Sequence, residues 1–233
     1  MNKFMNACLI GSLVFMLGLA GAVTYEFGSK VALGDSDVGN LLYNTEHVFR
    51  YWDLGPAGYD QGDIVYMHMR STTCGDGCNL ISPNDIRITP FGSLAAGTKV
   101  TANDNDINKP LSSEDLHIMF TNLYGGPGYD FDDPVYLHVG PETGASTVTN
   151  DVRLNNIVNG FSAGTKVLDY DGDHNKPLVS LPPYAIRFFN ANGNYDGVVK
   201  KPLYDFADSV YLDFSTGSGD LGFVVVNDVR LSV

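Results

Sequence analysis

GTKVTANDNDINKPL at residues 97–111 and GTKVLDYDGDHNKPL at residues 164–178 are two copies of one motif. A third copy, GSKVALGDSDVGNLL, stands at residues 28–42. The three copies align without a gap at intervals of 69 and 67 residues. A fixed period of this kind indicates that one structural solution is used several times along the chain.

Three further blocks follow each copy in the same order. An apolar stretch such as HIMFTNL at 117–123 comes first, then a tyrosine–aspartate block such as YDFDDPVYLHV from Tyr129. The last block, called the NDxR block here, reads NDIRI at 84–88 and NDVRL at 150–154 and 227–231. Four ordered blocks repeated three times divide the chain into repeat units at residues 23–95, 96–162 and 163–233.

The blocks have the two-residue period of β-strands. In VYMHM, Val65, Met67 and Met69 alternate with Tyr66 and His68, which predicts a strand with one buried face. No segment has convincing helical spacing with caps. We therefore expect an all-β protein with about four strands in each unit. Two arrangements fit this expectation: serial sandwich-like units, or one pseudo-threefold β-barrel.

Residues 1–22 have the features of a signal peptide. Lys3 precedes an apolar run, and Ala20 and Ala22 have the spacing that a signal peptidase requires. We expect cleavage after Ala22; the alternative is an uncleaved membrane anchor, because the run approaches the roughly 20 residues that span a bilayer. No second segment of that length follows. The prediction is a protein of the cell exterior or envelope, without a membrane span after cleavage.

The charge is strongly acidic, with a formal net charge of −13. Such a chain is an unlikely match for nucleic acid, whose phosphates bind basic surfaces. Of the acidic residues, 23 are aspartate and only 4 are glutamate. Aspartate favours turns and oxygen-rich ion sites over helices, so the acidity has a structural pattern.

Within each motif copy, aspartates alternate in the pattern Asp-x-Asp; these segments, residues 35–37, 104–106 and 171–173, are called the acidic loops. Alternation turns several hard oxygens toward one point, and Ca²⁺ takes six to eight oxygen ligands at about 2.3–2.6 Å. The glycine and the terminal glutamate of an EF-hand loop are missing. The sequence predicts calcium sites with the candidate ligands Asp35, Asp37, Asp104, Asp106, Asn108, Asp171, Asp173 and Asn175.

A second pair of carboxylates recurs in the tyrosine–aspartate blocks. It either completes the calcium sphere or forms another site; the alternative for both sets is that the side chains cap turns. Gly39 stands where the other copies have asparagine, so the first site should be weakest. The pairs are Asp60 with Asp63, Asp130 with Asp133, and Asp205 with Asp208.

Other polar residues have simpler interpretations. Cys74 and Cys78 predict a local disulfide, with a bridge between molecules as the alternative. His68 and His138 occupy equivalent positions, where unit 3 has Asp213; we expect solvent-facing histidines, with metal ligation or a polar contact as the alternatives. The Asp and Arg of each NDxR block, such as Asp85 with Arg87, predict a structural ion pair.

Catalysis is not indicated by any motif. HExxH, GxSxG and P-loop patterns are absent from the sequence. Paired carboxylates can serve a glycosidase, but a catalytic constellation is normally singular, whereas these aspartates occur three times. We therefore expect a protein that is not an enzyme.

The repeated NDVRL, AGTKV with NKPL, and DxVYL blocks resemble those of secreted sheath and surface-layer proteins of methanogenic archaea. The resemblance covers nearly all of the chain after residue 22. It implies a structural subunit that assembles with copies of itself, stabilised by calcium in our reading, with cell-surface glycan as a further partner. No Asn-x-Ser/Thr sequon occurs, which favours a sheath over a glycosylated layer. The competing prediction is a secreted, calcium-dependent carbohydrate-binding or adhesion module that uses exposed tyrosines and Trp52.

Overall fold

The structure is a computed structural model, and it describes residues 25–69, 79–123, 125, 128–156, 160–181, 183–197, 201–214 and 221–232. The predicted signal peptide, residues 1–22, and the predicted disulfide of Cys74 and Cys78 lie outside these residues. The described part contains strands and turns but no helix, which confirms the all-β prediction.

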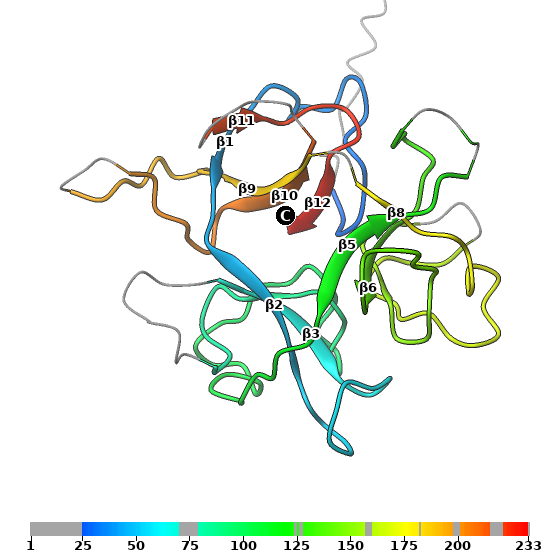
Figure 1. Ribbon diagram of the computed structural model, residues 1–233. Helices are drawn as coiled ribbons and strands as arrows, with labels where there is room; N and C mark the ends of the chain where they lie inside the picture. The colour runs from blue at the N-terminus through cyan, green and yellow to red at the C-terminus, as the bar shows by residue number, and fades with distance from the viewer. Residues whose placement is uncertain are drawn as a thin grey trace, which may run out of the picture.

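The twelve strands form three antiparallel sheets, which Figure 1 shows around a common centre. The sheet orders are β2-β3-β4, then β7-β6-β5-β8, then β11-β1-β9-β10-β12. The strands are β1 (Leu41–Asn44), β2 (His47–Trp52), β3 (Ile64–Met69), β4 (Ile86–Arg87), β5 (Leu116–Phe120), β6 (Val135–Val139), β7 (Val152–Arg153), β8 (Val179–Ser180), β9 (Ala185–Phe189), β10 (Ser209–Asp213), β11 (Leu221–Phe223) and β12 (Val229–Ser232).

Each sheet is built on the same three strands of the repeat. The apolar stretch pairs with the Val-Tyr strand, and the Val-Tyr strand pairs with the NDxR block. This gives β2-β3-β4 in the first unit, β5-β6-β7 in the second and β9-β10-β12 in the third.

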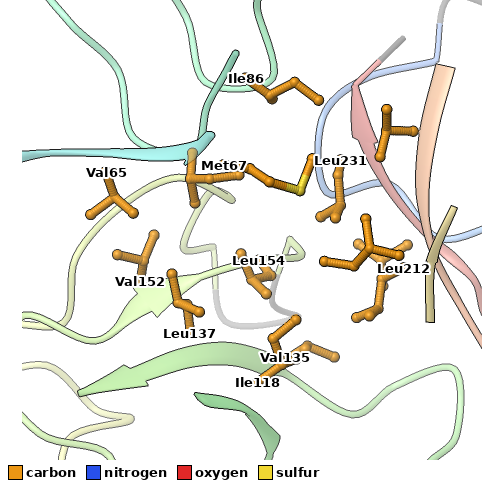
Figure 2. Packing of buried hydrophobic residues seen from close by; sticks show 14 of the residues in the cluster. Val65, Met67, Ile86, Ile118, Val135, Leu137, Val152, Leu154, Leu212 and Leu231 are labelled. Carbon is orange, nitrogen blue, oxygen red and sulfur yellow. The ribbon is translucent and has the colours of Figure 1, made fainter. Parts of the chain in front are cut away.

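One hydrophobic core is shared by all three units, and Figure 2 shows its packing. Met67 of the first unit, Leu137 of the second and Leu212 of the third belong to the same buried cluster. Serial, separately packed sandwiches would have given one core for each unit. The arrangement is therefore a pseudo-threefold one around a common core.

Both faces of the Val-Tyr strands are buried, which the period-two pattern did not predict. Val65 and Met67 on β3 face the common core, whereas Tyr66 between them joins a smaller cluster with Val100. The outer face is covered because the following motif copy folds over it. Tyr136 and Tyr211 lie in equivalent small clusters behind the other two sheets.

The motif copies pair with the unit that precedes them in the ring. Lys99 bridges to Ile86, and Lys166 bridges to Val152. Lys30 of the first copy bridges to Val229 near the end of the chain. The two ends of the described chain are thus joined, and the three-dimensional units are offset from the sequence repeats.

Three equivalent glycines meet where the units come together. Gly28, Gly97 and Gly164 have φ of 75°, 80° and 81°. A Cβ at Gly97 would lie 2.5 Å from the Cβ of Phe27, and one at Gly164 would lie 2.4 Å from the Cβ of Ala96. Both the left-handed backbone and the close approach require glycine here.

Replacing Gly164 with alanine should therefore destabilise the protein twice over. The left-handed backbone costs about 1–3 kcal/mol for a residue with a Cβ, and the overlap with Ala96 adds about 1–3 kcal/mol. Gly144→Ala is the matched control, because Gly144 has φ of 68° and open space around its Cβ position. Urea unfolding of both variants measures the difference, and equal losses would contradict close packing at Gly164.

Candidate functional site

The acidic loops bind arginine side chains of the NDxR blocks. Arg87 donates from Nε to Asp106 Oδ2 at 2.8 Å, and from Nη2 to Asp106 Oδ1 at 2.8 Å and Asp104 Oδ2 at 2.6 Å. Its Nη1 donates to Thr98 Oγ1 and to the carbonyl of Lys99, both at 3.1 Å. All five N–H donors of the guanidinium are thereby satisfied.

The same network occurs in the other two places. Arg153 binds Asp171 and Asp173, with nitrogen–oxygen distances of 2.7 Å and 2.6 Å for its Nη2. Arg230 binds Asp35 and Asp37 at 2.8 Å each, although the partners are 195 and 193 residues apart in sequence. Each arginine residue is only 1% exposed. The third copy of the network is the one that closes the ring.

A buried tyrosine completes each network. The hydroxyls of Tyr66, Tyr136 and Tyr211 donate to the second aspartate of the acidic loop at 2.7, 2.9 and 3.0 Å. Burial, with the adjacent carboxylate, raises the pKa of these tyrosines above the ordinary value. These tyrosines are not the exposed sugar platform that the competing sequence prediction required.

The asparagine of the Asp-x-Asp-x-Asn pattern has a backbone role. Asn108 and Asn175 have φ of 61° and 63°, and Gly39 at the equivalent position has φ of 85°. The backbone N–H of each donates to a carbonyl at 2.8 Å. Asparagine and glycine are the residues that most readily adopt this left-handed conformation. The backbone conformation therefore explains why glycine stands at position 39 where the other copies have asparagine, and no ligand is needed.

The second carboxylate pairs cap turns. Asp63 accepts the backbone N–H of Asp60 at 2.8 Å and that of Leu54 at 2.9 Å. Asp133 and Asp208 accept the equivalent backbone hydrogen bonds. The two aspartates of each pair are three residues apart because the second side chain accepts the backbone N–H of the first and so closes the turn between them.

A lysine ammonium lies against each of these turns. Lys30 Nζ donates to the carbonyls of Asp130 at 2.9 Å and Asp133 at 2.7 Å, and lies 4.4 Å from the ring centroid of Tyr129. Lys99 and Lys166 contact the turns that begin at Asp205 and Asp60 in the same way. Each contact joins different units, because the lysine and its turn are 100 or more residues apart.

Both sets of predicted calcium ligands therefore lie beside an internal cation. Among the residues that the structure describes, no group of three or more His, Cys, Asp or Glu side chains is arranged to hold a metal ion. Calcium stays a prediction, and an ion at an acidic loop would have to compete with the guanidinium for the same carboxylate oxygens.

The two equivalent histidines are buried, contrary to the sequence prediction. His68 Nδ1 lies 2.8 Å from Asp85 Oδ2, and His138 Nδ1 lies 3.0 Å from Asp151 Oδ2. The predicted pair of Asp85 with Arg87 is wrong, because the donors of Arg87 are taken by Asp104 and Asp106. Asp85 lies in the turn before β4, where it binds His68 and accepts the backbone N–H of Ser82.

Unit 3 has a different buried cluster at this position. Asp213 replaces the histidine and lies 2.5 Å from Arg187 Nη1. Burial, together with the neighbouring Asp213 and Asp37 carboxylates, raises the pKa of Asp228 to about 8, although backbone N–H groups of Phe214 and Val225 oppose the shift.

Unit 3 also carries an insertion that the repeat pattern did not predict. Twelve residues, 192–203, separate its apolar block from Tyr204, whereas residues 55–58 make this connection in unit 1. The inserted segment borders two hollows beside the link between β1 and β2. Aligning the blocks by their unequal gaps would have found it.

No family model, curated protein or solved structure matches this chain. The part of the chain that the structure describes holds no helix with the length and apolar character needed to cross a membrane.

Replacing Arg153 with lysine should cost about 3–5 kcal/mol of unfolding free energy. The charge is kept, but the forked hydrogen bonds to two carboxylates are lost in a buried place. Arg50→Lys is the control and should cost about 1 kcal/mol, because Arg50 Nη1 donates to the hydroxyl of Ser113. Denaturant titration measures the unfolding free energy of both variants. Similar losses would contradict the importance of the forked hydrogen bonds from Arg153 to Asp171 and Asp173.

The unfolding free energy should fall as the pH rises from about 4 to about 8. Over this window folded Asp228 keeps a proton that the unfolded chain has released, so the folded state binds more protons and loses stability with rising pH. Asp228→Asn should flatten this part of the profile, and Asp132→Asn, at an exposed position, should not. Urea titrations at several pH values provide the measurement; an unchanged slope in Asp228→Asn would contradict the assignment.

Proposed function

We propose that this protein is a secreted structural subunit of an extracellular sheath or surface layer, and that it has no catalytic activity. The observation that carries the proposal is that the recurring polar residues are paired with one another. The arginines, lysines, tyrosines and aspartates that define the repeat bind one another across the unit boundaries. Their repeated role is to hold a closed unit together.

Such a unit suits a load-bearing layer. Fully hydrogen-bonded buried ion networks fix one arrangement of the chain, because each charge that loses its partner costs several kcal/mol. The net charge of −13 keeps the free subunit soluble before it assembles.

The third sheet offers a contact surface for self-assembly. β11 is the outermost strand of that sheet, and Phe223 on it is 54% exposed. Edge strands can pair with strands of another molecule. A head-to-tail contact, in which β11 pairs with a different edge of the next molecule, gives an open filament where the rotation does not close into a ring.

Electron microscopy of the purified chain from residue 23, with calcium and then with a chelator, tests the proposal. We expect filaments, hoops or sheets, and we expect Phe223→Lys to reduce them at unchanged circular dichroism. Leu33→Lys is the control, since Leu33 is 88% exposed on unit 1. A monomer under all conditions would overturn the proposal.

The same samples test calcium separately. Calorimetry should show a higher unfolding temperature with calcium than with chelator if the ion binds the folded chain. An unchanged unfolding temperature would remove the calcium prediction and leave the structural role standing.

A further inference from the structure

Unit 3 interrupts the pseudo-threefold arrangement with a built hairpin. The backbone N–H of Asp196 donates to the carbonyl of Lys201 at 2.9 Å, and that of Leu203 donates to the carbonyl of Asn194 at 3.0 Å. At its base, Asn194 Nδ2 donates to Asp205 Oδ2 at 2.5 Å. Figure 1 shows this arm extending away from β9 and β10. These hydrogen bonds fix the position of the stem of the hairpin.

The hairpin and the link between β1 and β2 border two open hollows at the seam of units 1 and 3, which together are called the trough. Two hollows of about 520 and 680 Å³ flank this link, residues 44–46. Lys201 and Pro202 of the hairpin border both hollows. Volumes of this size are those of small-ligand sites.

Aromatic rings and oxygen atoms line the trough together. Tyr43 and Tyr184 border the larger hollow, and the hydroxyl of Tyr43 lies 3.4 Å from that of Tyr195 on the hairpin. Tyr184 and Tyr195 are 42% and 47% exposed. Glu46 lines both hollows. Exposed ring faces beside hydrogen-bonding oxygens offer both apolar and polar contact to a ligand.

We propose that this trough binds a neutral oligosaccharide. Ring faces of tyrosine pack against the C–H faces of a sugar, and carboxylate oxygens accept hydrogen bonds from its hydroxyls. Lys201, Glu46 and Asp196 all border the smaller hollow, so its lining carries two carboxylates beside one ammonium and is not a basic surface. In a chain of net charge −13, an acidic polymer would be repelled.

The inference goes beyond the structural role and does not depend on assembly. It gives the subunit a means of attachment to a polysaccharide at the seam of units 1 and 3. Phe223 of β11 pairs with Leu41, at the opposite end of β1 from the trough residue Asn44. Tyr43, Tyr184 and Tyr195 take no part in the hydrogen bonds between the arginines, the buried tyrosines and the acidic loops. Substitutions of these three residues therefore leave those hydrogen bonds in place.

Calorimetry of the chain from residue 23 against a panel of neutral and uronic-acid oligosaccharides tests the site. At least one neutral oligosaccharide should bind, and Tyr184→Ala should weaken it about 10-fold, as expected for loss of an aromatic contact of about 1.4 kcal/mol. Tyr170→Ala is the matched control, because Tyr170 is 83% exposed outside the trough; it should change the affinity less than about 2-fold.

Glu46→Gln is a second variant that tests the site if Tyr184→Ala fails to fold, and it should also weaken binding. Absence of binding by every neutral oligosaccharide, stronger binding of the acidic ones, or equal effects of Tyr184→Ala and Tyr170→Ala would overturn the inference. Electron microscopy of Tyr184→Ala should still show assemblies, so failure of the sugar site and failure of the structural role are distinguishable.

Discussion

The contact of Arg230 with Asp35 and Asp37 is the constraint on which the fold depends. It fastens the last NDxR block to the first motif copy, and so turns three tandem repeats into a ring with one core. A buried guanidinium is costly unless all its donors are paired, and this one is fully paired. Arg87 and Arg153 make the same contact between consecutive units. The ring is therefore closed by the same arginine–aspartate contact that joins one repeat to the next.

Closure explains why lysine and tyrosine recur with the arginine. Each motif lysine reaches a turn of a different unit, and Tyr59, Tyr129 and Tyr204 donate to the carbonyl of an NDxR asparagine in yet another unit. Every unit is therefore held to the others by several kinds of contact. A single repeat would lack these partners, and its buried polar groups would be unpaired.

Periodicity was sufficient to predict the all-β class and the three strands that recur in every sheet, because alternation of Val65, Tyr66 and Met67 reports local geometry. It did not predict β1, β8 and β11. It was insufficient for the partners of the carboxylates. Carboxylate oxygens satisfy a calcium ion and a guanidinium equally well, and spacing within one loop does not reveal which approaches. Asp106 and Arg87 are 19 residues apart, and Asp37 and Arg230 are 193 apart, so the pairing is a property of the closed ring. The buried histidines escaped prediction for another reason: alternation along a strand does not show that its outer face is also covered. His68 and His138 bind the NDxR aspartates of their own units, 17 and 13 residues further along the chain.

The ring contains two kinds of residue: those whose polar groups are occupied by contacts within the ring, and those found in one unit alone. The arginines, tyrosines and aspartates of the recurring networks face inward or across a seam, where hydrogen bonds occupy their donors and acceptors. The differences between units lie elsewhere: the inserted hairpin, the exposed Phe223 of β11 and the cluster of Asp213 with Arg187 all belong to unit 3. A symmetric scaffold places equal demands on equivalent positions. Gly39 meets the same backbone demand as Asn108 and Asn175, whereas the inserted hairpin meets no demand that the other units share, so its cause lies outside the scaffold. This reasoning directs the search for attachment and assembly to unit 3, and away from the acidic loops that first attract attention in the sequence.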